Sequence, residues 1–198
     1  MGEARRTQEQ RRTATMARLV DACVESLCEL GYQRSTISEI CARSGVSQGG
    51  LFRHFPTRLD LVIAAADSVR ARQFEAFSQS LAPLGTGTLA DCLVLVRQAC
   101  RAPINGAWYE LLIAARTDAG LRDRLAPLLA EYHDQIAQFA RTVPAVQGLP
   151  DGQVELVALT IVHLFDGEAV AAAVNPQPEL EQQRLELVLG WLAGAADR

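Results

Sequence analysis

Apolar residues recur at helical spacing along most of the chain, whereas the alternation typical of strands is nearly absent. Leu19, Cys23, Leu27 and Leu30 mark one face of a first helix, which we predict from residue 13 to a stop at Gly31. The same spacing predicts further helices over about residues 36–44, 47–55, 57–80, 88–101, 105–116, 119–141, 151–173 and 179–196. We therefore predict an all-α protein of about nine helices.

Local signals define several of these helix ends. Thr36 and Glu39 form a predicted capping box, in which the hydroxyl and the carboxylate satisfy free backbone N–H groups. Ser47 is expected to cap the next short helix, and Pro56 to end it, because the residue before a proline avoids the α region. Pro127 lies inside a long predicted helix and should kink it or divide it in two.

Residues 36–55 combine a short helix, a glycine-containing turn and a second short helix, which is the pattern of a helix-turn-helix. The major groove of DNA is about 12 Å wide and admits one helix whose side chains reach the base edges. The residues expected to pack this segment against its neighbours are Ile37, Ile40, Val46, Leu51 and Phe55. The residues left to face outward are Gln48, Gly49, Gly50, Arg53 and His54.

Charge is distributed unevenly along the chain of 198 residues, whose formal net charge is -4. Residues 1–72 hold 11 arginines and 8 acidic residues, a net charge of +3, whereas the remainder holds 8 arginines and 15 acidic residues, a net charge of -7. A basic N-terminal part followed by an acidic remainder favours contact between residues 1–72 and a polyanion. An excess of +3 is modest, so ordinary variation in composition is an equally good interpretation of the charge alone.

Composition and motifs argue against several classes of protein. Hydrophobic residues make up 49% of the chain, too many for disorder, and the longest apolar run falls short of the roughly 18 residues of a membrane span. With no apolar stretch behind the N-terminal charges, we expect a soluble cytoplasmic protein without membrane contact. The sequence has no phosphate-binding loop, nucleophile elbow or metal-ligand spacing, so we expect neither an enzyme nor a cofactor or metal. The 5 cysteines argue against a disulfide framework, and a redox-sensing pair stays open.

The segment from Gly45 to Leu61, GVSQGGLFRHFPTRLDL, resembles the signature of the TetR family of bacterial repressors. A G-V-S turn, a recognition helix that ends in an aromatic-x-His-Phe run, and a basic residue at the start of the next helix stand where the family places them. Upstream positions that also fit are Leu30, Gly31, Tyr32, Thr36 and Ile40. The resemblance is specific over about residues 13–65, and beyond them it rests on the number and length of the helices.

The resemblance implies a DNA-binding transcriptional regulator with assigned roles along the recognition helix. It implies base-facing roles for Gln48, Gly49 and Gly50. It implies contacts with backbone phosphates for Thr36, Ser47, His54 and Arg58, and a mixed role for Arg53. The chemistry agrees, because Gln pairs with adenine, Arg with guanine or phosphate, and hydroxyls suit phosphate oxygens. For Thr36 and Ser47, helix capping alone is the alternative.

Two features depart from the family's pattern. Phe52, in the same DNA-facing set, replaces the usual Tyr and lacks a hydroxyl for phosphate. Gly49 and Gly50 replace bulkier residues, and each costs a helix roughly 1 kcal/mol relative to alanine. We therefore expect the recognition helix to be partly frayed without DNA, with more of the base reading left to Gln48, Arg53 and the backbone.

The helix predicted over residues 151–173 is apolar on nearly every side, so it should face its own core on one side and a second subunit on the other. In the TetR family the last two helices form a four-helix dimer interface, and two recognition helices about 34 Å apart read a palindrome. The interface residues expected from this resemblance are Val154, Val157, Ile161, Phe165, Leu185, Val188, Leu189, Trp191 and Leu192. A core helix within a monomer is the alternative.

The family's middle helices enclose an effector pocket. The candidate lining residues here are Trp108, Tyr109, Leu112, Tyr132, His133, Phe139 and His163. Each also suits an ordinary core, where aromatic residues at helical spacing usually pack. The surroundings favour a small apolar or aromatic effector. The predicted mechanism is allosteric repression, in which effector and operator DNA weaken each other's binding by equal free energies.

The chain therefore divides into three predicted parts: a basic N-terminal arm (1–12), a helix-turn-helix domain (13–72) and a ligand-binding and dimerisation domain (73–198). The arm would carry Arg5, Arg6, Arg11 and Arg12 to the DNA, or be a solvated tail. An all-α protein that binds or sequesters a small molecule is the alternative function, but it leaves the pattern of residues 36–55 unexplained. A DNA binder without an effector would leave the body only a scaffold for the dimer.

Overall fold

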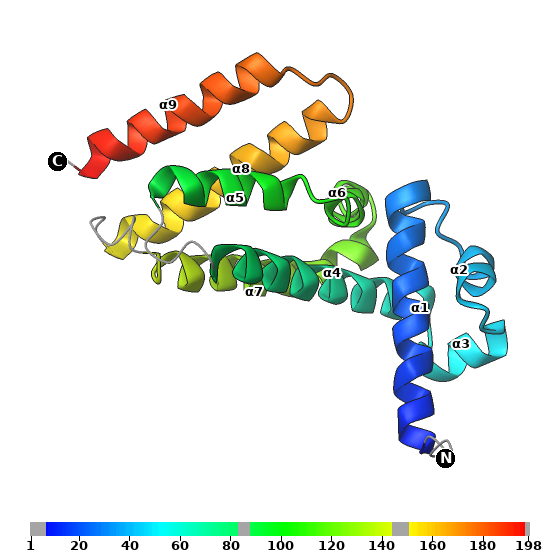
Figure 1. Ribbon diagram of the computed structural model, residues 1–198. Helices are drawn as coiled ribbons and strands as arrows, with labels where there is room; N and C mark the ends of the chain where they lie inside the picture. The colour runs from blue at the N-terminus through cyan, green and yellow to red at the C-terminus, as the bar shows by residue number, and fades with distance from the viewer. Residues whose placement is uncertain (1–6, 83–87, 144–150, 197–198) are drawn as a thin grey trace, which may run out of the picture. The chain divides into compact units, whose positions relative to one another are not determined.

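The computed structural model describes residues 7–82, 88–143 and 151–196 of the chain. Nine α-helices occupy these residues and no strand occurs among them, which confirms the all-α prediction. In chain order the helices are α1 (Gln8–Leu30), α2 (Ile37–Ser44), α3 (Gln48–His54), α4 (Arg58–Leu81), α5 (Leu89–Cys100), α6 (Asn105–Ala114), α7 (Ala119–Ala140), α8 (Asp151–Ala172) and α9 (Pro178–Ala196) (Figure 1).

The first helix begins earlier than the sequence predicts. Thr7 and Gln10 form a capping box, in which Gln10 N donates to Thr7 Oγ1 over 3.2 Å and Thr7 N donates to Gln10 Oε1 over 2.9 Å. Arg11 and Arg12 therefore lie in α1, and placing them in an arm before the helix was wrong. The other two arginines of the predicted arm lie outside the described residues.

Two further helix predictions have different outcomes. The predicted start of α4 is confirmed, because Thr57 N donates to Asp60 Oδ2 and Asp60 N donates to Thr57 Oγ1, each over 3.1 Å. Pro127, by contrast, lies within α7 without dividing it, so the predicted alternative of two helices is wrong. A proline removes one backbone hydrogen bond, and the remaining turns of this 22-residue helix are enough to continue it.

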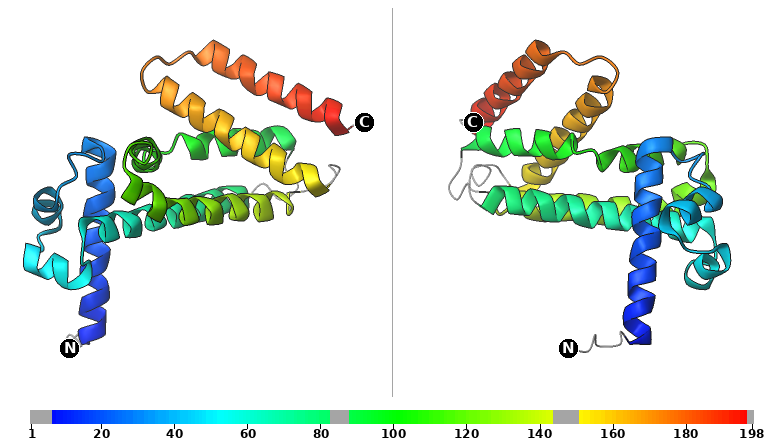
Figure 2. Two further views of the ribbon diagram at one scale, coloured as in Figure 1. Left: turned by 180° about the vertical axis from the view of Figure 1, so that it is seen from behind. Right: turned by 45° about the vertical axis from the view of Figure 1, so that its right-hand side comes forward.

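The chain divides into two compact units, each of which is described by itself. The head unit consists of Met1–Ala71 and Pro103–Leu128, and the body unit of Arg72–Ala102 and Leu129–Arg198. In the head unit, α1 contacts both α2 and α6, and α2 contacts α3 (Figure 2). Its largest fully buried side chains include Leu19, Leu27, Ile40, Leu51, Leu61 and Leu111. Each such leucine favours the folded state by roughly 2 kcal/mol, so this core holds the helix-turn-helix rigidly on α1.

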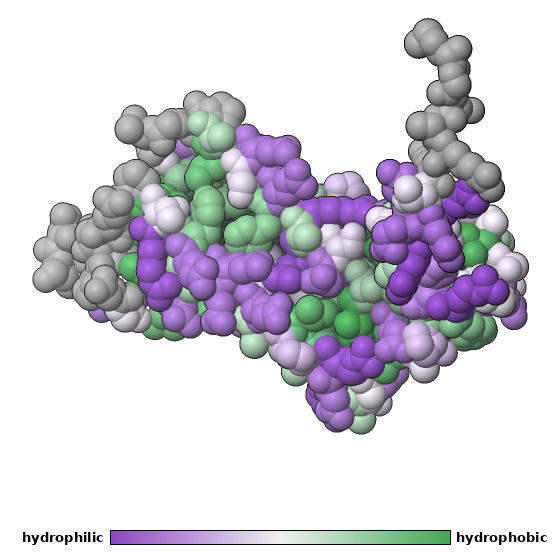
Figure 3. Space-filling model, turned by 90° about the horizontal axis from the view of Figure 1, so that it is seen from below, coloured by the Kyte–Doolittle hydropathy of each residue, from purple (hydrophilic) through white to green (hydrophobic). Residues whose placement is uncertain are grey.

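In the body unit, α5 packs against α8 and α9. The main buried apolar cluster of these three helices consists of Leu93, Cys100, Val162, Phe165, Leu185 and Val188. Residues from all three helices contribute to it, so the apolar stripes of α5, α8 and α9 point toward one another. No helix among the described residues is long and apolar enough to cross a bilayer. On the face of the molecule seen in Figure 3, polar (purple) and apolar (green) areas alternate.

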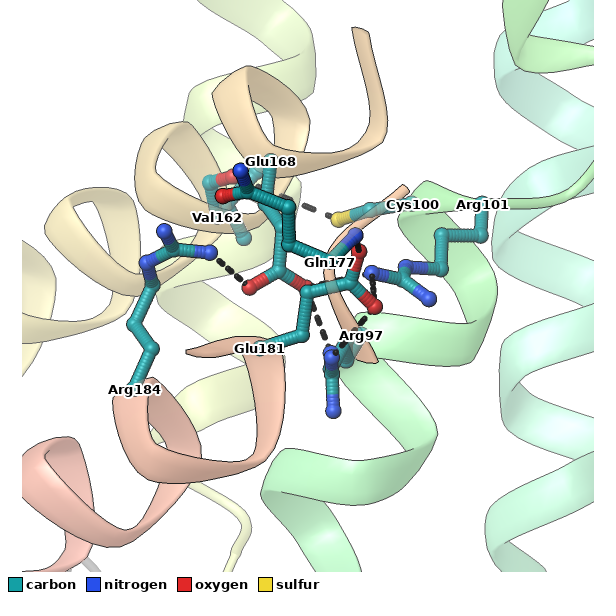
Figure 4. A network of polar contacts seen from close by, with 8 residues as sticks. All are labelled: Arg97, Cys100, Arg101, Val162, Glu168, Gln177, Glu181 and Arg184. Carbon is teal, nitrogen blue, oxygen red and sulfur yellow. Dashed lines mark hydrogen bonds and ion pairs between the residues drawn. The ribbon is translucent and has the colours of Figure 1, made fainter. Parts of the chain in front are cut away.

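A network of charged side chains also joins α5, α8 and α9 (Figure 4). The carboxylate of Glu168, whose side chain is 2% exposed, contacts Arg97 at 2.5 Å, Arg101 at 2.8 Å, and Arg184. Glu181 contacts Arg101 at 2.8 Å and Arg97 at 3.3 Å, and the hydrogen bond from Arg101 lowers the pKa of its carboxyl. Buried charges are tolerated when each is paired, so the network specifies how α9 docks on α5 and α8.

Candidate nucleic-acid interface

The helix-turn-helix of the head unit consists of α2, a turn at Gly45, and α3. Gly45 has φ of 64°, in the left-handed region that glycine adopts without strain, and this conformation ends α2. The guanidinium of Arg18 in α1 donates to the carbonyl of Ser44 and so fixes the turn to α1. The predicted anchors are all buried or half-buried: Ile37, Ile40, Val46, Leu51 and Phe55. The segment therefore has a packed inner face and a solvent-facing outer face.

The outer face of α3 carries most of the residues predicted to face DNA. Gln48, Gly49 and Arg53 are exposed, and the side chain of Phe52 is 46% exposed. Gly50 and His54 are half-buried, because they lie toward the inner side of the same short helix. An outward row of amide and guanidinium groups on one helix is the arrangement that reading of base edges requires. The DNA contacts themselves stay predictions.

The two hydroxyls predicted to touch phosphate are helix caps. Thr36 Oγ1 accepts from Glu39 N and Ser47 Oγ accepts from Gly50 N, each over 3.2 Å. Each bond uses the hydroxyl oxygen as an acceptor, so the O–H hydrogen can still donate to a phosphate oxygen. The predicted capping box is only half right, because the Glu39 carboxylate accepts from Arg43 over 2.7 Å and not from the backbone of Thr36.

Arg58, predicted to contact phosphate, is bound within the head unit. Its Nε donates to the carbonyl of Ser35 over 2.8 Å and its Nη2 donates to the carbonyl of Tyr32. Its Cζ also lies 4.3 Å from the centroid of the Tyr32 ring, a cation–π contact. The side chain thus fastens the start of α4 to the segment between α1 and α2, and a phosphate contact would have to use its remaining N–H groups.

Gly49 and Gly50 offer a matched pair of substitutions that tests the predicted fraying. A Cβ at Gly49 would meet nothing within 4 Å, whereas a Cβ at Gly50 would lie 3.0 Å from Cγ1 of Val46 and 3.3 Å from Oγ of Ser47. We expect Gly49→Ala to raise the free energy of unfolding of the head unit by up to about 1 kcal/mol, and Gly50→Ala to raise it less or to lower it. Thermal unfolding followed by circular dichroism measures both.

Hydrogen exchange supplies the control for this pair. If α3 is frayed, its amides exchange quickly in the unchanged protein and more slowly in Gly49→Ala. Slow exchange of α3 in the unchanged protein without DNA would contradict the fraying, since the alanine would then have no disorder to remove.

The residues predicted to line an effector pocket fall in both units. Three of them lie on α6 of the head unit: Trp108, Tyr109 and Leu112. Trp108 is 2% exposed and belongs to the core of that unit. The other four lie in the body unit: Tyr132, His133, Phe139 and His163.

In the body unit, the aromatic candidates form a connected set of rings, in which Tyr132 and His133 lie with their ring centroids 6.4 Å apart. Phe74 of α4, which the sequence prediction missed, makes edge-to-face contacts with Tyr132 and Phe139, with ring centroids 6.2 Å and 6.3 Å apart. The rings of His133 and His163 lie 5.3 Å apart. Burial, and then the neighbouring His163, lower the pKa of His133, which favours its neutral form at neutral pH. The structure therefore supplies an apolar aromatic group and, beside it, two imidazole rings in contact.

A surface hollow of about 340 Å³ in the body unit includes His163 in its wall, and its other lining residues come from α8, α9 and the segment between them. Tyr132, His133 and Phe139 do not line it. No group of three or more metal-ligating side chains is present among the described residues.

The predicted dimer residues mostly pack inside their own chain. Phe165, Leu185 and Val188 belong to the body core and are at most 5% exposed, so they cannot supply an interface surface. Val154 is also buried, and Val157, Ile161, Leu189 and Leu192 are half-buried. Of the predicted set, Trp191 alone is broadly exposed, at 63%.

Other apolar side chains are exposed on and beside α8 and α9: Leu156, Val170, Val174, Leu180, Leu187 and Trp191. The sequence prediction missed five of these six. The available signal was their spacing, because Leu180, Leu187 and Trp191 follow one another at seven and four residues and so share one face of α9.

Comparisons with known proteins agree with this geometry. Residues 19–65 match the sequence profile of the family described as bacterial regulatory proteins, tetR family. The chain is 38% identical over 189 residues to an HTH-type transcriptional regulator of Mycobacterium tuberculosis, covering 94% of this chain and 97% of the relative.

Two solved structures show the same fold at low identity. A transcriptional regulator from Rhodococcus sp. Rha1 is similar with a TM-score of 0.75 at 22% identity, covering 91% of this chain and 97% of that one. The Bacillus subtilis regulator FadR, solved in complex with stearoyl-CoA, is similar with a TM-score of 0.63 at 22% identity, covering 87% of this chain and 96% of that one. The helix-turn-helix, the matching profile and the full-length relative together show that the chain belongs to the TetR family of HTH transcriptional regulators.

Proposed function

We propose that the protein is an effector-responsive repressor that binds a palindromic operator as a homodimer. The observation that carries the proposal is the outer face of α3, where Gln48 and Arg53 are exposed while Leu51 of the same helix is fully buried. Amide and guanidinium groups read adenine and guanine edges, and the capping hydroxyls of Thr36 and Ser47 can bind the flanking phosphates.

The exposed apolar face of α9 supports dimerisation. Leu180, Leu187 and Trp191 are 47%, 51% and 63% exposed. Large apolar side chains grouped on one face of a helix mark an interaction surface, and tryptophan often contributes most of the binding energy there. A second copy that covers this face with its own would give a symmetric pair with two α3 helices, as a palindrome requires.

The effector we propose is a small apolar or aromatic molecule. Support comes from the rings of Phe74, Tyr132 and Phe139, which contact one another in the body unit. FadR, which has the same fold, was solved with stearoyl-CoA, a ligand with a long apolar chain. Effector and operator would weaken each other's binding through a shared conformational equilibrium.

DNA binding measured with and without compounds tests the proposal. Duplexes selected from random sequences by the purified protein should share a palindrome, and their affinity should fall as salt rises. Stearoyl-CoA or a member of a panel of small aromatic compounds should weaken binding by about fivefold or more. Specific binding that none of these weakens would leave a plain DNA binder, and the absence of specific binding would leave the sequestering function.

A variant of the α9 face belongs in the same experiment. Trp191→Asp should yield monomers in analytical ultracentrifugation and weaken operator binding by roughly 30-fold, because burial of a carboxylate opposes association. Gln182→Asp, at an exposed polar position on the opposite side of the same helix, is the control and should leave both unchanged. If Trp191→Asp remained dimeric, α9 would not form the interface.

A further inference from the structure

Tyr32, in the segment between α1 and α2, uses every interacting group that it has. Its N–H donates to Glu110 Oε2 over 3.2 Å, and its hydroxyl donates to Asp118 Oδ2 over 3.0 Å. Its carbonyl accepts from Arg58, whose Cζ lies 4.3 Å from the ring centroid. The residue is 6% exposed. One side chain with its own peptide group thus joins α4, α6, the start of α7 and the segment that leads into the helix-turn-helix.

Each partner of Tyr32 is itself held in place. Asp118 Oδ1 accepts from Leu121 N over 2.9 Å and so caps α7. This bond and the one from Tyr32 lower the pKa of Asp118, while burial and the same bond raise the pKa of Tyr32. Arg58 also bonds Ser35, one residue before the cap of α2. The contacts therefore form a continuous path of polar bonds.

The approach of Glu110 to the segment between α1 and α2 is close. Gly31 has φ of 77°, and a Cβ built on it would lie 2.6 Å from Oε2 of Glu110. No side chain other than hydrogen fits there while the carboxylate keeps its place. A displacement of α6 would therefore break the bond to Tyr32 or carry the segment, and with it the entry to α2, along.

This path begins on the helix that carries predicted effector residues and reaches the helix-turn-helix through Arg58. Tyr109 of that predicted set is the sequence neighbour of Glu110, and both lie in α6. We propose that Tyr32 is the coupling residue through which α6 and the start of α7 sense and control the position of the helix-turn-helix. The inference rests on the proposed function, because it assigns a route for regulation of DNA binding.

Reciprocity makes the route testable with DNA as the ligand. If Tyr32 couples the two regions, DNA bound at α3 should also slow amide exchange in α6, because coupling between two sites acts in both directions. We expect the selected operator duplex to slow amide exchange within residues 105–114 by about fivefold or more in the unchanged protein. In Tyr32→Phe, which removes only the bond to Asp118, the slowing in α6 should fall below about twofold while that in α3 persists.

Three further variants separate coupling from stability. Glu110→Ala should also lose the slowing in α6, whereas Glu110→Gln should keep it, because the amide oxygen can still accept from Tyr32 N–H. Arg124→Gln removes the exposed pair with Asp60 at 3.1 Å, another polar link from α4 to α7, and should leave the slowing unchanged. Thermal unfolding of each variant shows whether the fold is retained.

The outcomes distinguish the inference from the function on which it rests. If DNA fails to slow exchange of α3 in the unchanged protein, DNA binding by α3 is refuted. If α3 is protected, but α6 is unaffected or is protected equally in Tyr32→Phe, the coupling role of Tyr32 is overturned and the function stands. Loss of the α6 response in Arg124→Gln would likewise overturn it, since the route would then not be specific to Tyr32.

Discussion

Arg53→Glu is expected to weaken operator binding by about 100-fold while the protein stays folded. Arg53 is exposed on α3, and the structure records no hydrogen bond or ion pair of its guanidinium with the described residues. Loss of one base or phosphate contact by an arginine costs roughly 1–3 kcal/mol, and the introduced carboxylate adds repulsion from the DNA backbone. Fluorescence anisotropy with a labelled operator duplex measures the change, and the salt dependence should become shallower as well.

The control for this variant is Arg116→Glu, which makes the same change of charge at an exposed position just after α6. It should weaken operator binding only slightly, through the change in net charge, because no direct DNA contact is lost. Arg58 is unsuited to the comparison, because its internal bonds to Tyr32 and Ser35 make any substitution there a change of fold as well. Undiminished affinity in a folded Arg53→Glu dimer would refute the assignment of α3 as the recognition helix.

Glu168→Ala is expected to lower the free energy of unfolding of the body unit by about 3 kcal/mol. The change leaves Arg97, Arg101 and Arg184 around a buried site with only the carboxylate of Glu181 to share. Removing one partner of a buried ion pair typically costs 3–5 kcal/mol, and the partial exposure of the three arginines places this case near the lower end of that range. Urea unfolding measured at two salt concentrations gives the magnitude.

Glu179→Ala is the matched control, because Glu179 is an exposed carboxylate in the first turn of α9. It should change the free energy of unfolding by less than about 0.5 kcal/mol. Replacing Glu168 with leucine tests the mechanism further, since a buried apolar side chain still leaves Arg184 without its carboxylate and Arg97 and Arg101 with only that of Glu181. Equal stability of Glu168→Ala and the unchanged protein would mean that α9 docks through its apolar contacts alone.

The helix-turn-helix could be predicted from the sequence because its signals are local. Thr36 and Ser47 cap the helices that follow them, and Gly45 supplies the left-handed residue of the turn, all within a few positions of the feature that they control. The anchors Ile40 and Leu51 follow from helical spacing in the same stretch. Such short-range rules hold wherever the neighbouring structure does not override them.

The partners of the long polar side chains could not be predicted in the same way. The bonds of Tyr32 reach Glu110 and Asp118, which are 78 and 86 positions away, and no local pattern joins such residues. Arg58 looked like a phosphate contact for the same reason, since the carbonyls that it binds become neighbours only in the folded head unit.

The spacing of apolar residues also could not predict which side of α8 is buried and which is exposed. Apolar residues surround this helix almost completely, so their spacing does not say which side meets the chain's own core. The structure places Phe165 inside and leaves Leu156 exposed, although the sequence prediction had assigned Phe165 to the dimer.

The chain holds 2 tryptophans, one in each unit, and they lie in opposite surroundings. Trp108 is shielded at 2% exposure and Trp191 is open to water at 63%. Their fluorescence should therefore differ in emission wavelength. Trp108 should emit at shorter wavelength and report unfolding of the head unit, whereas Trp191 should emit at longer wavelength and report subunit association. Single-tryptophan variants would turn the protein into its own label-free sensor of both events.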